Sequence, residues 1–342
     1  MRKMAHLCTC SLNLERRVAL ILAFIVLFCL GQASLVLASD EDFTIVVFPD
    51  TQYIVSSGSE KWRSMCRWVV DNKIQLDIRA VLSVGDITDT GSDRDFKFAS
   101  VGFSDIENVG IPCVPIVGNH DYDFTPSNRA VTKFDASFGP MRFVDKPWYG
   151  RNMNESNANY YITISIGKRK MMILALEFFP RDDSIAWASS VIDANAEAEV
   201  IVLTHGFLNY DGTRTKDSDS YGPAYYSLKN SNSGDNLWNN LIKKKPNIRA
   251  VICGHQINGP HTAYSRAVGD NGNTVYQLFM NYQYTYDAWL GILSFHTLQR
   301  QLEVAYYRTA GGSGPGYDPE SPKYSVAWEP MITTADQEVP VK

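Results

Sequence analysis

The sequence predicts an α/β fold, because short apolar stretches alternate along the chain with longer stretches whose apolar residues recur at helical spacing. The first three strands are expected at 43–48, 80–84 and 113–117, with helices between them at 61–72 and 96–109. Strands and helices that alternate in this way form parallel sheets with right-handed crossovers.

Further elements are expected in the second half of the chain. The turn-forming pair Gly167-Lys168 separates two alternating runs and predicts a β-hairpin. Two helices then alternate with two strands, and the last three strands are expected to form an antiparallel meander. These elements are the hairpin strands 160–166 and 171–176, the helices 183–194 and 237–244, the strands 200–204 and 249–253, and the meander strands 274–280, 290–295 and 301–307.

Two polar stretches without regular periodicity, 122–159 and 209–233, are expected to be long loops. No internal repeat divides the sequence. We therefore expect one domain over 39–310, followed over 311–342 by a surface tail that is rich in Gly, Pro and Ser.

The first 38 residues have the pattern of a targeting segment. Arg16 and Arg17 precede the apolar run 18–30, and Val36-Leu37-Ala38 offers a small-residue cleavage site. A signal peptide is one interpretation; the other is an uncleaved signal anchor, because 18–38 is long enough to span a bilayer. Either interpretation predicts a secreted or extracytoplasmic domain, with membrane contact only through an uncleaved anchor.

The charge of the chain argues against a dedicated nucleic-acid surface. The formal net charge is −5, and because residues 1–38 carry +3, the rest of the chain carries −8. Nucleic-acid binders need clustered cations that displace the counterions of the phosphates. A phosphate-bearing small substrate is compatible with this composition.

Five expected strands end in polar residues of one chemical kind, namely Asp50, Asp86, Asn119 with His120, His205 and His255. Ligands of open α/β sheets gather at the carboxyl ends of the strands. Oxygen and imidazole ligands without thiolate suit Zn, Mn, Fe or Mg. The sequence therefore predicts a site for one or two divalent or trivalent metal ions.

A two-metal site would explain this mixture of side chains. Two ions about 3.5–4 Å apart need a bridging carboxylate, which Asp86 can supply. The neutral amide of Asn119 would add an oxygen without further charge. Histidines would anchor the ions, and one unligated histidine could protonate a leaving group.

Four segments resemble the motifs of the calcineurin-like metallophosphoesterases in order and spacing. They are Gly85-Asp86-Ile87-Thr88-Asp89, Gly118-Asn119-His120-Asp121, Thr204-His205 and Gly254-His255. The resemblance covers roughly residues 43–260. It implies the α/β/β/α sandwich of that family, with four layers. The segment 48–53 (FPDTQY) is similar to a branch that carries Asp-Thr-Gln in its first motif.

The resemblance also implies roles for individual residues. Asp86 would bridge both ions, and Asp50 would bind one of them. The other ion would be completed by Asn119, His205 and His255. His120 would lie beside the phosphate as the catalytic acid or as a stabiliser of the transition state. Asp121 would orient His120.

The sequence departs from the family's pattern around the Asp50-side ion. Ile257 stands where the family has a second histidine, two residues after His255, and Gln52 replaces another customary histidine. An amide oxygen is a weaker ligand than imidazole, so the shell of this ion is expected to be thin. His261 is a candidate to replace the missing histidine.

The resemblance implies an extracytoplasmic phosphoesterase in which a metal-bound hydroxide attacks phosphomonoesters or phosphodiesters. The alternative is a metal-binding but catalytically weak member that acts as a ligand-binding or surface protein. Tyr53, Trp148 and Tyr149 are candidates for the wall of the substrate pocket, although packing aromatics are the commoner outcome for such residues.

Overall fold

The structure, a computed structural model, describes residues 42–321 and 323–328. The expected signal peptide or anchor and residues 329–342 lie outside this range. No helix within the described range is long and apolar enough to cross a membrane.

Two seven-stranded sheets form the centre of the fold. The first has the order β13 (Gly316–Tyr317), β12 (Gln301–Ala310), β11 (Ala288–His296), β1 (Phe43–Phe48), β2 (Ile78–Ser83) and β3 (Cys113–Val114), with β14 (Tyr324–Ala327) paired to β12. The second has the order β4 (Tyr149–Met153), β5 (Ser156–Ile166), β6 (Arg169–Leu176), β7 (Glu199–Thr204), β8 (Ile248–Cys253), β10 (Thr274–Met280) and β9 (Thr262–Val268).

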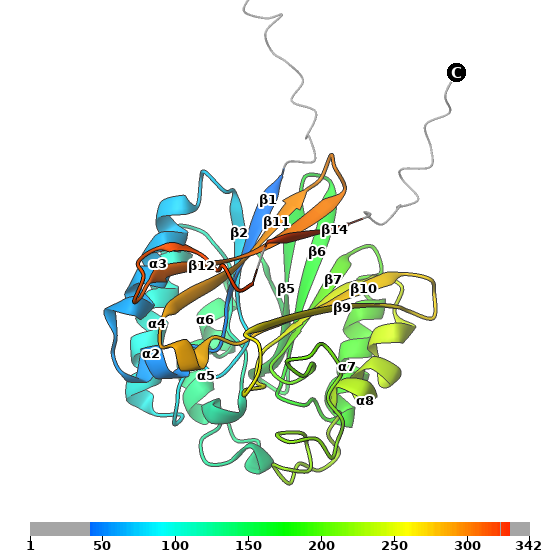
Figure 1. Cartoon of the computed structure of the whole chain (residues 1–342). Helices are drawn as coiled ribbons and strands as arrows, with labels where there is room; N and C mark the ends of the chain where they lie inside the picture. Colours follow the sequence, from blue (N-terminus) through cyan, green and yellow to red (C-terminus); the bar gives the residue numbers. More distant parts are fainter. Residues whose placement is uncertain (1–41, 322, 329–342) are drawn as a thin grey trace, which may run out of the picture. The chain divides into compact units, whose positions relative to one another are not determined.

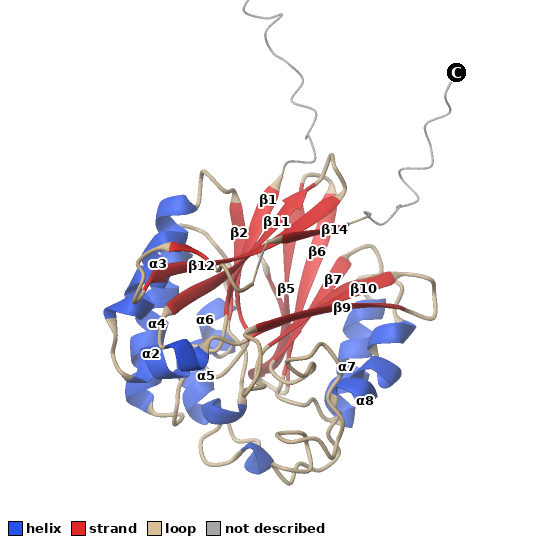
Figure 2. Ribbon diagram, viewed as in Figure 1, coloured by secondary structure: helices blue, strands red, loops and turns tan. Residues whose placement is uncertain are grey.

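Helices cover the outer face of each sheet, as Figures 1 and 2 show. The first sheet carries α2 (Gln52–Ser56), α3 (Glu60–Asn72), α4 (Asp93–Asn108), α5 (Thr132–Phe138) and α6 (Pro140–Phe143). The second carries α7 (Asp182–Asp193) and α8 (Gly234–Asn240). Four short 3-10 helices, of which η1 (Asn119–Asp121) and η4 (Gln283–Thr285) matter for the site, complete the described elements.

Three hydrophobic cores separate the layers, and β1 shows how one strand serves two of them. Ile45 and Val47 pack between the sheets, whereas Val46 and Phe48 pack against the helices. Because alternate side chains point to opposite faces, a strand that is covered on both sides must be apolar throughout. The expected α/β/β/α sandwich is confirmed.

The parallel strands β1, β2, β7 and β8 lie close to where they were predicted, and the helices begin slightly earlier than expected. Ser59 caps α3 by accepting a hydrogen bond from Lys61 N, and Ser92 caps α4 by accepting one from Asp95 N. Such caps satisfy backbone N–H groups that have no partner within the helix. The third strand is shorter than expected, because Pro112 and Pro115 flank β3 and cannot donate to a ladder.

The antiparallel pair β11–β12 of the expected meander is confirmed, but the placement of its first strand, β10, is wrong. Strand β10 pairs in parallel with β8 in the second sheet, whereas β11 pairs with β1 and β12 in the first. The partner of β10 on its other side is β9, which the sequence did not indicate. Alternation along a strand reports burial of one face, and it does not identify the neighbouring strand.

Two stretches are more regular than expected. Residues 122–159 contain α5, α6 and β4, and the buried faces of α5 and α6 carry Phe134, Phe138 and Phe143. After residue 310, β13 and β14 pair with β12, and Trp328 is buried against the hydrophobic core between the two sheets. The described residues on both sides of position 310 belong to one compact unit. Residues 209–233 lack helices and long strands, as expected.

Candidate metal centre

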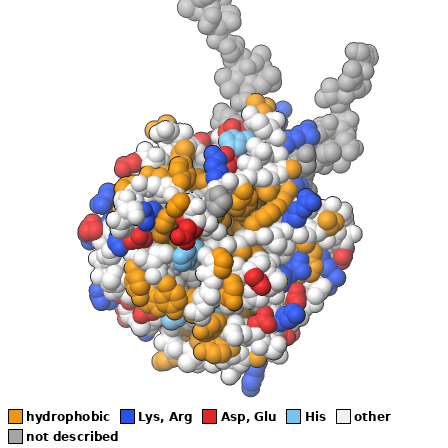
Figure 3. Space-filling view, in the orientation of Figure 1, with side chains coloured by type: hydrophobic (Ala, Val, Ile, Leu, Met, Phe, Trp, Pro, Cys, Tyr) orange, Lys and Arg blue, Asp and Glu red, His pale blue; other side chains and the backbone are white. Residues whose placement is uncertain are grey.

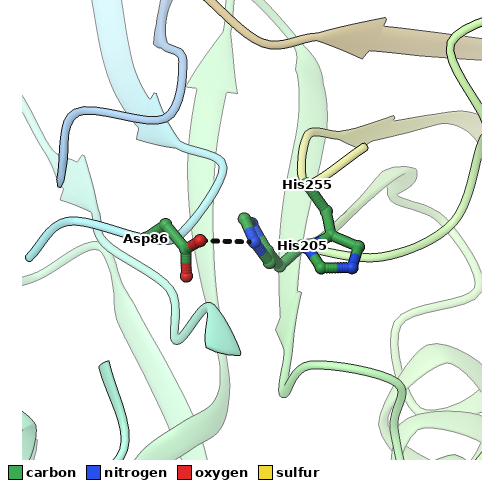
Figure 4. Close-up of side chains that lie close together, drawn as sticks. All are labelled: Asp86, His205 and His255. Carbon is green, nitrogen blue, oxygen red and sulfur yellow. Dashed lines mark ion pairs between the residues drawn. The ribbon is translucent and has the colours of Figure 1, made fainter. Parts of the chain in front are cut away.

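Three side chains from both sheets converge at the carboxyl ends of their strands. Asp86 follows β2, His205 follows β7 and His255 follows β8. One ligand atom from each lies within 4.8 Å of the others, and all three side chains are buried (Figure 4). The Nε2 atom of His205 lies 3.2 Å from Asp86 Oδ2 and 3.2 Å from Asn119 Oδ1.

Backbone carbonyls fix which nitrogen of each histidine faces the site. The Nδ1–H of His205 donates to Val84 O at 2.7 Å, so its Nε2 lone pair is directed at Asp86. The Nε2–H of His255 donates to Tyr221 O at 2.9 Å, which leaves Nδ1 as its ligand atom. Metal-binding histidines are oriented in this way by a second hydrogen bond.

The loops behind the ligands approach each other so closely that glycine is required. A Cβ at Gly118 would lie 2.1 Å from Asp86 Oδ1, and one at Gly85 would lie 2.8 Å from His205 Nδ1. Asp86 and His255 themselves have positive φ angles of 46° and 80°. Residues other than glycine adopt this region at a cost, and such strain gathers at functional sites.

A second group of side chains surrounds Asp50. Gln283, with its amide nitrogen turned toward Asp50, donates to that carboxylate at 2.7 Å. The amides of Gln52 and Gln283 also contact each other.

The electrostatics of the two groups fit a cation. Burial and the charge of Asp86 raise the pKa of Asp50 well above its usual value. Burial, together with the neighbouring His205, lowers the pKa of His255 to about 3, so this imidazole is neutral at physiological pH. Neutral imidazole is the form that binds a metal ion, and a cation beside Asp50 would favour the carboxylate form that burial and Asp86 disfavour.

His120 lies at the edge of the site with one nitrogen free for a substrate. Its Nδ1–H donates to the carbonyl oxygen of Asp89 at 2.6 Å, and its backbone N–H donates to Asp86 Oδ1 at 2.8 Å. Burial would lower the pKa of His120, but Asp86 and the Asp89 carbonyl outweigh it and raise that pKa. The expected orienter of the ring, Asp121, is replaced in this role by Asp89.

Asp121 instead ties two ligand-bearing loops together. Its carboxylate accepts hydrogen bonds from the backbone N–H groups of Ile87, Thr88 and Gly118 and from the Thr88 hydroxyl, all at 2.9–3.0 Å. Burial and the charge of Asp86 raise the pKa of Asp121 to about 6. Its position supports a bracing role for the loops that carry Asp86 and Asn119.

A pocket of about 340 Å³ opens above the candidate metal ligands. Sequence reasoning found Tyr53 as a wall residue, whereas Trp148 and Tyr149 pack against Phe143 in the core. His261 lies outside this pocket, where it hydrogen-bonds Asn281 O and stacks on Tyr282. The pocket is lined by Gln52, Tyr53, Asp86, Asn119, His120, Tyr221, Tyr225, Tyr226, His255, Ile257, Gln283 and Tyr284.

Five of these lining residues were not identified from the sequence: Tyr221, Tyr225, Tyr226, Gln283 and Tyr284. The three tyrosines of the 209–233 loop occur in a stretch without periodicity, so their direction could not be derived. Gln283 and Tyr284 belong to η4, which connects the two sheets. Only the density of aromatic residues in these loops could have indicated them.

The sandwich of two sheets and the Asp/Asn/His cluster between their strand ends define a metallophosphoesterase fold. The model of the calcineurin-like phosphoesterase family matches residues 43–259, and the chain belongs to this family. The recognition made from the motifs is thereby confirmed.

The chain is similar to several named proteins. It is 28% identical over 277 residues to the uncharacterized protein YvnB of Bacillus subtilis (strain 168), a match that covers 78% of this chain and 20% of YvnB. The structure of purple acid phosphatase PPD1 from yellow lupin seeds matches with a TM-score of 0.53 and 14% identity, over 89% of this chain and 57% of that one. NAD nucleotidase of Haemophilus influenzae matches with a TM-score of 0.45 and 12% identity, over 87% and 55%. The chain thus spans about a fifth of its curated relative and somewhat more than half of these two solved chains.

Proposed function

We propose that the protein is a metal-dependent hydrolase of phosphoric esters that acts outside the cytoplasm. The observation that carries this proposal is the convergence of Asp86, His205 and His255 at the strand ends of two sheets, with His120 beside them. The proposed location rests on the targeting pattern of residues 1–38.

The residues around the site fit metal ions of the Mn, Zn, Fe or Mg type. Asp86, Asn119, His205 and His255 would hold one ion, and Asp50, Asp86 and Gln52 a second. Ions bound there would neutralise phosphate oxygens and lower the pKa of a water molecule. The Nε2 atom of His120, which its bond to Asp89 leaves available, would donate a proton to the leaving oxygen.

The mixed charges on the face shown in Figure 3 agree with a small substrate. On the face shown in Figure 3, Lys and Arg side chains are scattered among acidic ones and do not form a stripe. Phosphate recognition would therefore depend on the pocket itself.

A second candidate function is metal-dependent binding with weak catalysis. The observation that favours it is Ile257, which lines the pocket where the family has a second histidine ligand. An aliphatic side chain cannot ligate, so the second ion would have few protein ligands.

The experiment is to remove metal from the full chain with a chelator, reload it with Mn, Zn or Fe, and measure hydrolysis of 4-nitrophenyl phosphate and bis(4-nitrophenyl) phosphate. We expect hydrolysis that depends on reloading and that falls at least about 100-fold in His205→Ala. The matched control is His296→Ala, because His296 lies outside the site and pairs with Asp42. Full activity in His205→Ala would refute the site. One bound ion without turnover of either ester would favour the binding function.

A further inference from the structure

The pocket above the metal ligands is aromatic and lacks cationic side chains of the usual kind. Five tyrosines line it, and among its described lining residues none is lysine or arginine. The charge and the walls of this pocket both restrict the phosphate ester that it can accept.

The charges favour a monoanionic ester. A phosphodiester brings one negative charge to a pocket whose described lining includes the carboxylate of Asp86 and no lysine or arginine. A phosphomonoester brings about two near neutral pH, since its second pKa is close to 6, and no arginine lines the pocket to take the second in a bidentate pair.

The tyrosines form two separate groups on different elements. Tyr53 of α2 lies 5.8 Å, between ring centroids, from Tyr284 and 5.2 Å from Tyr286. In the loop after β7, Tyr225 lies 5.1 Å from Tyr221 and 4.9 Å from Tyr226.

The exposed rings of each group can stack on a planar substituent. Tyr225 is 64% exposed and Tyr284 is 48% exposed, whereas Tyr226 is held against His255 and Phe178. Stacking on aromatic side chains is sequence-tolerant and requires only a planar face. A diester has two substituents on phosphorus, and the pocket has a ring group for each; a monoester would leave one group without a partner.

We propose that the substrate of this site is a small phosphodiester with a planar aromatic ring on at least one of its ester groups. This inference rests on the proposed hydrolase function and names its substrate class. The substrate is expected to be small, because a chain with a net charge of −5 disfavours long polyanions, whose binding needs clustered cations.

The first experiment compares esters on the metal-loaded full chain. We expect kcat/KM for bis(4-nitrophenyl) phosphate to exceed that for 4-nitrophenyl phosphate by about tenfold or more. In parallel, calorimetry measures binding of diphenyl phosphate, phenyl phosphate and dimethyl phosphate. Diphenyl phosphate is expected to bind most tightly, because it alone combines a single charge with two rings.

Variants separate the two parts of the argument. Tyr225→Leu and Tyr284→Leu should each weaken diphenyl phosphate binding by about tenfold and leave dimethyl phosphate binding unchanged. Tyr225→Phe keeps the ring and should retain binding, which guards against a folding defect. The matched control is Tyr317→Leu, since Tyr317 is 66% exposed, contacts Tyr307 and lies outside this pocket.

The outcomes distinguish this inference from the hydrolase function. Equal or better use of 4-nitrophenyl phosphate would overturn the substrate class and leave the hydrolase intact. Selective binding of diphenyl phosphate without hydrolysis of any ester would support the ligand class and refute the hydrolase. Equal binding of all three probes, or displacement of diphenyl phosphate by a single-stranded oligonucleotide at similar concentration, would overturn the inference.

Discussion

The Nε2 atom of His205 lies 3.2 Å from a carboxylate oxygen of Asp86, although Asp86 follows a strand of the first sheet and His205 follows a strand of the second. Both side chains are almost fully buried. The two sheets must therefore pack in their native register before these candidate metal ligands meet. The candidate site is thus a property of the sandwich as a whole and not of one βα unit.

Replacing His120 should separate catalysis from metal binding. In His120→Gln we expect kcat to fall by about 100-fold while the metal content stays the same, because the ring is placed as a proton donor and not among the clustered ligands. In the metal-free chain, Asp86 raises the pKa of His120. In the metal-loaded enzyme, the acid form of His120 is lost as the pH rises through its pKa. The kcat profile of the wild type should accordingly fall on its alkaline side, and this fall should be absent in the variant. Loss of bound metal in His120→Gln would contradict the assignment.

Removing the Asp50 charge should stabilise the metal-free protein. Folding raises the pKa of Asp50 above its ordinary value of 3.8, so the folded chain holds this proton more tightly than the unfolded chain does. The free energy of unfolding therefore falls as the pH rises through the folded pKa. In a chelator at pH 7.5, Asp50→Asn should melt about 4 °C or more above the wild type.

The same pair of proteins supplies the control. Below the unfolded pKa both side chains are neutral, so the difference in Tm should disappear near pH 3.5. Added Mn²⁺ should raise the Tm of the wild type more than that of Asp50→Asn. A variant that is less stable than the wild type at pH 7.5 in chelator would show that Asp50 is satisfied without a metal ion.

The substitution Ile257→His should strengthen metal binding on the Asp50 side of the site. Ile257 lines the pocket beside His255 and Gln283. We expect Ile257→His to raise the affinity of the weaker metal ion by about tenfold or more, because imidazole can ligate where an aliphatic group cannot. Titration of the chelated protein with Mn²⁺ measures this affinity, with Ile257→Ala as the size control. An unchanged second affinity would place the ion elsewhere.

Asp121 should matter for stability even without metal. Its buried carboxylate accepts four hydrogen bonds, three of them from backbone N–H groups. Asp121→Ala leaves these donors without a partner and should lower the free energy of unfolding by about 3 kcal/mol or more. Urea denaturation in a chelator measures the loss. Asp71→Ala, at an exposed position of α3, should change stability little, and an equally mild effect of Asp121→Ala would refute the bracing role.

The ends of the parallel strands were predictable, because each strand is a local apolar run that stops at a polar residue. Apolar runs that stop at Asp86, His205 and His255 identified the candidate ligands, which follow β2 of the first sheet and β7 and β8 of the second. Right-handed crossovers restrict the strand order within each sheet, whereas the packing of the two sheets brings Asp86 to the two histidines. The replacement of the family's second histidine by Ile257 was also visible in the sequence.

The pocket walls were not predictable for a physical reason. Tyr225 and Gln283 are carried by segments whose conformation depends on contacts between distant residues, such as the bond from His255 to Tyr221 O. No periodicity reports such contacts. The pairing of β10 with β8 was missed for the same reason, because alternation fixes which face is buried and leaves the partner strand open.

The number of metal ions bound per chain tests the central claim most directly. Elemental analysis of the purified full chain, after exposure to Mn, Zn and Fe and removal of free ions, should find at least one ion per chain. His205→Ala should lose that ion and His296→Ala should keep it. A wild-type chain that retains no metal ion under any of these conditions would contradict the assignment of Asp86, His205 and His255 as a metal site.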